Sequence, residues 1–140
     1  MNLIIGSHVS YNNKSQLLGS VKEALSYKAN TFMFYTGAPQ NTNRSVIEDS
    51  LTMEAYKLMK ENNIALEKVI VHAPYIVNLA NFNNFDFSVS FLINEVERCS
   101  TLGIKYLVLH PGSAVNCSRE EAINNISKGL NLILDNDYDV

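Results

Sequence analysis

The chain has 140 residues, of which 46% are hydrophobic and 18% are charged, as is typical of one soluble globular domain with a sizeable core. The net charge of −3 excludes the overall basic signature of many nucleic-acid-binding proteins, although a local positive face or a metal can also bind phosphate. No signal peptide, transmembrane segment or lipidation motif is visible, and Cys99 and Cys117 form no CxxC pair. We therefore expect a cytoplasmic protein with two free thiols and no membrane partner.

Apolar runs and helical periodicities alternate four times along the chain. The predicted strands cover residues 3–5, 31–35, 68–71 and 105–109. The predicted helices cover residues 12–28, a segment with an apolar face from 47 to 59, residues 86–102, and a segment beginning at 118. Gly103 is expected to end the third helix, and Ser118 with Glu121 forms a capping box at the start of the fourth.

Four βα units in a row, without a hairpin signal between them, predict an α/β fold with a parallel sheet and right-handed crossovers. No linker or low-complexity segment interrupts residues 1–140, which we take as a single domain. Four such units fit either a small open sheet or half of an eight-unit barrel.

Two histidines stand at the ends of two predicted strands. His72 follows the run 68–71, and His110 follows the run 104–109. The chemistry of α/β proteins lies at the carboxyl ends of parallel strands, and neutral imidazole is the commonest metal ligand. If the two strands are neighbours, about 4.8 Å apart, the two rings emerge side by side and can share a zinc ion. A catalytic zinc site needs at least three protein ligands, so a pair of core histidines bonded to the backbone remains the alternative.

Three further segments follow predicted strands. His8 follows the first strand, where it can serve as a donor lining a pocket or stand in solvent. Tyr75 and Ile76 follow the third strand, where they can wedge into a base step of DNA or pack beneath their own loop. The polar loop 36–44 after the second strand offers amides, hydroxyls and a guanidinium suited to phosphate. The chain has neither a P-loop nor a GxGxxG motif, so no nucleotide cofactor is expected.

Taken together, these segments resemble the endonuclease IV family of zinc-dependent apurinic/apyrimidinic endonucleases. The resemblance extends over the whole chain and is carried by ordered blocks: IGSHVS at 5–10, FYTGAPQ at 34–40, VHAPY at 71–75 with NL at 78–79, RC at 98–99, and LHPGS at 109–113. The HPGS block, in the position of the fourth strand, is the most specific of them.

The resemblance implies a TIM barrel with three zinc ions at its C-terminal face, which cuts double-stranded DNA 5′ to an abasic site. In that picture His72 and His110 match two ligands of one zinc, and His8 matches a histidine that lines the pocket. Tyr75 and Ile76 match the loop that penetrates the duplex, and Gln40 lies where the loop of the second strand reaches the DNA. No catalytic residue beyond the metal ligands is implied within this chain.

The sequence departs from the family in its length. The remaining ligands of the family come from strands five to eight, and none of them can lie in residues 1–140. We therefore expect the N-terminal half of a TIM barrel that is inactive alone. Such a half-barrel exposes the edges of its first and fourth strands, which favours a homo-oligomer.

Two other functions stay open on the residues themselves. A sugar isomerase or epimerase on a divalent-metal TIM barrel also places histidines at strand ends, although Tyr75 and the loop of the second strand fit DNA better. A truncated, metal-poor half-barrel that only self-associates is a non-enzymatic alternative.

Overall fold

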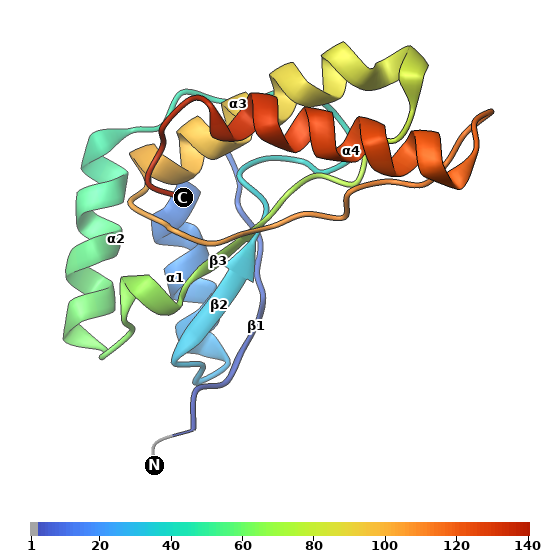
Figure 1. Cartoon of the computed structure of the whole chain (residues 1–140). Coiled ribbons are helices and arrows are strands. Elements are labelled where there is room, and N and C mark those ends of the chain that lie inside the picture. Colours follow the sequence, from blue (N-terminus) through green and yellow to red (C-terminus); the bar gives the residue numbers. More distant parts are fainter. Residues whose placement is uncertain (1–2) are drawn as a thin grey trace.

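The computed structural model describes residues 3–140, which form four consecutive βα units (Figure 1). The strands are β1 (Gly6–His8), β2 (Thr31–Phe34), β3 (Ile70–His72) and β4 (Leu107–Val108). The helices are α1 (Gln16–Ser26), α2 (Asp49–Glu61), α3 (Phe85–Thr101) and α4 (Arg119–Leu134), with short 3₁₀ turns η1 (Leu66–Lys68) and η2 (Phe82–Asn84). Among the described residues, no helix is both long enough and apolar enough to cross a membrane.

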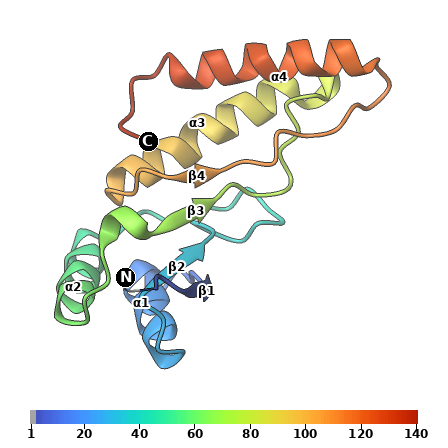
Figure 2. The same ribbon diagram turned by 60° about the horizontal axis from the view of Figure 1, so that its bottom comes forward.

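The strands form one parallel sheet in the order β1-β2-β3-β4, as the alternating pattern predicts. Figure 2 shows the helices along the outer side of the curved sheet, from α1 at one edge to α4 at the other. The opposite face of the sheet carries no helix of the described residues. This is the arrangement expected of half of a TIM barrel, whose strands would line the barrel interior on the uncovered face.

The core divides into two clusters of buried side chains on the helical side of the sheet. The first lies beneath α1 and α2 and includes Leu17, Val21, Phe32, Phe34, Met59 and Val71. The second lies beneath α3 and α4 and includes Val77, Leu79, Val89, Leu92 and Ile133. Alternation along β2 explains the division of its side chains, because Phe32 and Phe34 are buried among the helices and Met33 is only half-buried on the open face.

The helix ends follow the predicted signals. Gly103 follows the end of α3 with a φ of +61°, which glycine adopts without strain. At α4 the Ser118 hydroxyl accepts from the Glu121 amide, and the Glu121 carboxylate accepts from the Ser118 amide. This capping box satisfies two backbone donors that would otherwise lack partners in the first turn.

The prediction that the first strand covers residues 3–5 was wrong. The strand begins at Gly6, which pairs with Thr31, and Leu3, Ile4 and Ile5 are exposed. The Asn30 side chain accepts from the Ile5 amide and donates to the Leu3 carbonyl, so side-chain bonds take the place of backbone pairing before Gly6, and only the Asn30 amide donates to the Ile5 carbonyl. His8 is consequently the last residue of β1 itself.

Candidate functional site

The carboxyl ends of the strands bring together three rings on the open face of the sheet. His8 and His72 are the last residues of β1 and β3, and Tyr35 directly follows β2. The Tyr35 ring lies between the two imidazoles, with its centroid 4.7 Å from that of His8 and 5.2 Å from that of His72. No role was predicted for Tyr35 from the sequence. A signal for a role was nevertheless present, because Tyr35 ends the predicted strand that precedes the strand ending at His72 and follows the one ending near His8.

The surroundings of His8 shift its pKa. Partial removal of the ring from water lowers the pKa of His8 below its usual value, and the nearby His72 lowers it further. A backbone hydrogen bond at Val9 and the Glu23 carboxylate oppose that shift. The neutral imidazole, which can accept a hydrogen bond, is therefore favoured near pH 7.

One hydrogen bond fixes the tautomer of His72. Its Nδ1 lies 2.7 Å from the carbonyl oxygen of Ala73. A carbonyl can only accept, so Nδ1 carries the proton and donates, and the lone pair of neutral His72 is on Nε2. This is the usual arrangement of a metal-binding histidine, whose second nitrogen is held by a backbone carbonyl or a carboxylate.

His110 lies apart from the ladder. It is exposed and stands two residues beyond the end of β4. His72 pairs with Val108, so the prediction that the two histidines stand side by side was wrong in its register. The offset of two residues corresponds to roughly 6.6 Å along the strand direction. In this register Val71 pairs with Leu107 and His72 with Val108, so His110 lies two residues further along its own segment than the partner of His72.

The residues of this chain do not fit a complete metal site. In the part of the chain that the structure describes, no three side chains of His, Cys, Asp or Glu come close enough together to hold an ion. The tautomer of His72 suits a ligand, but a catalytic zinc needs at least three ligands from the protein. His72 and His110 can therefore be part of a donor set only if further donors come from elsewhere.

The side chains predicted to contact DNA lie on loops that follow the carboxyl ends of the strands, the end of the sheet where the three rings lie. Tyr75 follows β3 and is 60% exposed, whereas Ile76 beside it is half-buried against the second core cluster. Gln40 is exposed within the loop after β2. Of the two interpretations for the pair, Tyr75 has the exposure that contact with a partner requires, and Ile76 packs beneath its loop.

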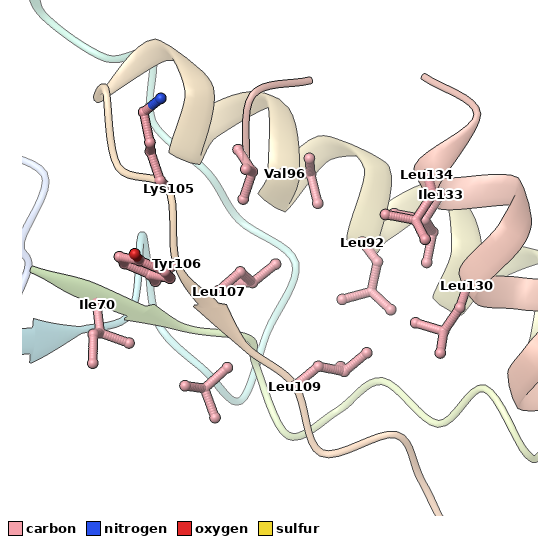
Figure 3. A pocket seen from close by; sticks show the side chains of 12 residues that line it. Ile70, Leu92, Val96, Lys105, Tyr106, Leu107, Leu109, Leu130, Ile133 and Leu134 are labelled. Atoms are coloured by element: carbon pink, nitrogen blue, oxygen red, sulfur yellow. The ribbon is translucent and has the colours of Figure 1, made fainter. Parts of the chain in front are cut away.

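Two hollows differ in character and position. A hollow of about 400 Å³ lies beside the rings and is lined by His8, Tyr35, Glu23 and residues 37–39. A more apolar hollow of about 420 Å³ lies away from the histidines, between β4, α3 and α4 (Figure 3). Figure 3 shows Leu92, Leu107, Leu109 and Leu130 around it. The first hollow has the polar groups expected of a site, and the second resembles a gap between packed layers.

Comparison with known proteins locates the chain among its relatives. The sequence model of the family described as xylose isomerase-like TIM barrel matches residues 21–139. A protein of Acholeplasma laidlawii named probable endonuclease 4 is 56% identical over 136 residues, which cover 96% of this chain and 46% of that protein. A protein of the same name from Bacillus subtilis is 50% identical over 142 residues, covering 99% of this chain and 47% of the relative.

Solved structures agree with these matches. Endonuclease IV from Thermus thermophilus superposes with a TM-score of 0.72 at 26% identity, covering 92% of this chain and 47% of that one. A xylose isomerase domain protein from Planctomyces limnophilus superposes with a TM-score of 0.60 at 12% identity, which shows the shared fold alone. The chain thus spans about half the length of the relatives it matches. The resemblance to the endonuclease IV family and the half-barrel fold are confirmed.

Proposed function

The chain belongs to the xylose isomerase-like TIM barrel family, and from this premise we propose that it is half of a DNA-repair endonuclease that hydrolyses the backbone 5′ to abasic sites. The observation that carries the proposal is the set of rings at the carboxyl edge, His8, Tyr35 and His72, within a chain 56% identical to a protein named probable endonuclease 4. The xylose isomerase domain protein matches at 12% identity, which supports the shared fold alone and does not by itself favour the sugar isomerase alternative.

In this proposal His72 and His110 supply two ligands for zinc, and His8 lines the pocket beside them. Zinc supplies activated water and neutralises a phosphate when it is bound. The remaining ligands would have to come from outside residues 3–140, because these hold no group of three suitable donors. We therefore expect the chain alone to bind metal weakly and to lack activity.

Tyr75 is the proposed contact with the lesion. It stands 60% exposed on the loop after β3, where its ring can stack on a base that has lost its neighbour. Tyr27 provides a matched control, since it is 59% exposed at the end of α1 and thus at the amino edge of the sheet.

The experiment compares binding of the chain to an abasic duplex and to an intact duplex by fluorescence anisotropy. We expect a preference for the abasic duplex that falls by about 5- to 160-fold in Tyr75→Ala, the equivalent of the usual ~1–3 kcal/mol per stacked base. Gln40→Ala should weaken binding less, and Tyr27→Ala should not change it. Equal binding to both duplexes would contradict the proposal, and clean 5′ incision by this chain with added zinc would refute its expected inactivity.

The same half-barrel supports a proposal about assembly, in which a second copy of the chain covers the two sheet edges. One edge exposes Leu3, Ile4 and Ile5, and the other exposes Tyr106 and Val108. Neither β1 nor β4 has a second strand partner within the described residues. Unpaired edges with apolar side chains favour association with another chain.

Light scattering tests this proposal, with an expected mass of twice that of one chain or more. Ile4→Lys or Tyr106→Lys places a charge on one edge and should shift the chain towards monomer. Met53→Lys, on an exposed part of α2, is the control and should leave the mass unchanged. A stable monomer at tens of micromolar wild-type protein would contradict self-association.

A further inference from the structure

The loop between β2 and α2, residues 35–48, is long and has no helix or strand of its own. It carries Gln40, the residue proposed to reach DNA. Loops of this length are held by specific contacts when they are functional and are otherwise disordered. The contacts of this loop therefore decide whether Gln40 has a fixed position.

The guanidinium of Arg44 closes the loop on itself. Its Nη1 donates to three carbonyl oxygens of the loop, those of Ala38 (3.3 Å), Asn41 (3.2 Å) and Asn43 (2.9 Å). Gly37 lies directly against it, and a Cβ at that position would lie 2.8 Å from Nη1. The loop is thus wrapped around one cationic group.

The same guanidinium joins the loop to α3. Its Nε donates to Glu95 Oε1, and the guanidinium lies 4.8 Å from the centre of the Phe91 ring. Both side chains of the pair are removed from water, with 6% of Arg44 and none of Glu95 exposed. The second carboxylate oxygen of Glu95 accepts from the Thr36 hydroxyl at 2.6 Å.

A second arginine, Arg98 of α3, holds both ends of the loop. Arg98 donates through Nη2 to the carbonyl oxygen of Thr36 (3.0 Å) and through Nη1 to that of Ser45 (2.8 Å). Its Nε donates to the Thr36 hydroxyl at 3.2 Å. Residues 36 and 45 are therefore fixed to the same helix by one planar group, a task that suits the rigid fork of arginine.

We propose that Arg44, Glu95 and Arg98 are positioning residues that set the conformation of the loop 36–45 and thereby place Gln40 at the DNA-binding edge. A buried ion pair contributes little net stability over apolar residues of the same shape, so its physical advantage lies in selecting one geometry. The part of the proposal that concerns DNA rests on the proposed function. The part that concerns the loop does not.

The experiment measures amide hydrogen exchange of residues 37–43 in the full chain, together with binding to the abasic duplex. Arg44→Met removes the hydrogen bonds from the guanidinium to the loop carbonyls. We expect amide exchange in the loop to become at least about tenfold faster, while the amides of α4 and β3 keep their exchange rates. Arg44→Lys keeps the charge but not the fork, so it should restore the slow exchange only in part. Lys105→Met, which removes a cation from an exposed ion pair, is the control. It should change neither the amide exchange of the loop nor the binding of the abasic duplex.

Binding of the abasic duplex should weaken about tenfold in Arg44→Met and by an intermediate factor in Arg44→Lys. If Arg44→Met does not fold, Gly37→Ala tests the same point, because its Cβ displaces the guanidinium without removing a charge. Unchanged exchange in the loop, or faster exchange over the whole chain alike, would overturn the positioning role. A faster loop with unchanged DNA binding would overturn its link to Gln40. If the wild-type chain binds no abasic DNA, the proposed function fails, while the exchange result still decides the role of Arg44.

Discussion

The loop after β2 and the loop after β4 leave the same edge of the sheet but are held in different ways. The first is fixed by Arg44, Glu95 and Arg98, which are buried or half-buried and bond to one another or to the loop backbone. The second, residues 109–117, is mostly exposed. Its contacts include the Leu79 amide donating to the Pro111 carbonyl and the Asn78 side-chain amide donating to the Ser113 carbonyl.

This difference divides the candidate site. Tyr35 and His72 stand on the side where the surrounding loops are anchored in the core, whereas His110 stands on the exposed loop. Segments with few buried contacts open locally at low free energy. The backbone around His110 should therefore open at a lower free energy than the backbone around His72.

The two cysteines give the largest expected contrast between the regions. Cys99 is fully buried on α3 in the first core cluster, and Cys117 is only half-buried at the end of the loop after β4. Burial, reinforced by the Glu95 carboxylate, raises the pKa of Cys99 to about 12, with Arg98 opposing the shift. The reactive form is the thiolate, so at pH 8 we expect iodoacetamide to modify Cys117 at least about 10⁴-fold faster than Cys99, which must wait for unfolding.

Mass spectrometry of modified peptides measures both rates. The variant Cys117→Ser should leave only the slow reaction, and urea above the unfolding transition should make the two cysteines equally reactive. Comparable rates in the native chain would show that the side around α3 is as open as the loop after β4.

Gly112→Ala tests how firmly the loop after β4 is seated. Gly112 has a φ of +120°, and a Cβ there would lie 2.0 Å from Asn78 Oδ1 and 3.2 Å from Asn78 Cα. Because the backbone of Asn78 cannot move as a flexible side chain does, we expect the free energy of unfolding to fall by about 1–3 kcal/mol. Urea unfolding measures that loss, and exchange of the Leu79 amide reports whether its bond to Pro111 is broken.

The exposed neighbour Ser113 supplies the control, since Ser113→Ala alters no side-chain hydrogen bond that the structure shows. A stability of Gly112→Ala equal to that of the wild type would mean that the loop moves away freely. The contrast with the anchored loop after β2 would then be larger than the contacts suggest.

The order of the elements was predictable because it depends on local signals. Apolar runs, helical periodicity, Gly103 and the Ser118 capping box each act within a few residues. The structure confirms the four predicted βα units in the predicted order. The register was less predictable, because it depends on pairing between distant segments. The bonds of Asn30 to the chain at Leu3 and Ile5 illustrate this, since they replace a strand that the apolar run alone predicts.

The anchoring of the loop after β2 was missed for a related reason. Glu95 and Arg44 are 51 residues apart in the sequence. A signal was nevertheless present, because Leu92, Glu95 and Cys99 share the inward face of α3 at helical spacing, which puts a carboxylate in an apolar stripe. A charged residue in such a stripe calls for a partner of opposite charge, and Arg44 is that partner.

The smallest expected effect belongs to the ion pair between Lys105 and Asp139, which stands on the exposed side of the molecule. Its side chains are 56% and 80% exposed, in contrast to the buried pair of Arg44 and Glu95. An exposed pair in water gains little because solvent screens it and two long side chains must be ordered, so Lys105→Met should change the free energy of unfolding by less than about 1 kcal/mol. Urea unfolding at about 0.15 M and 1 M salt measures the difference, which should shrink further at the higher salt. A loss of several kcal/mol that persists at high salt would mean that the pair is covered in solution, as it would be if a second copy packed against β4 and the end of the chain.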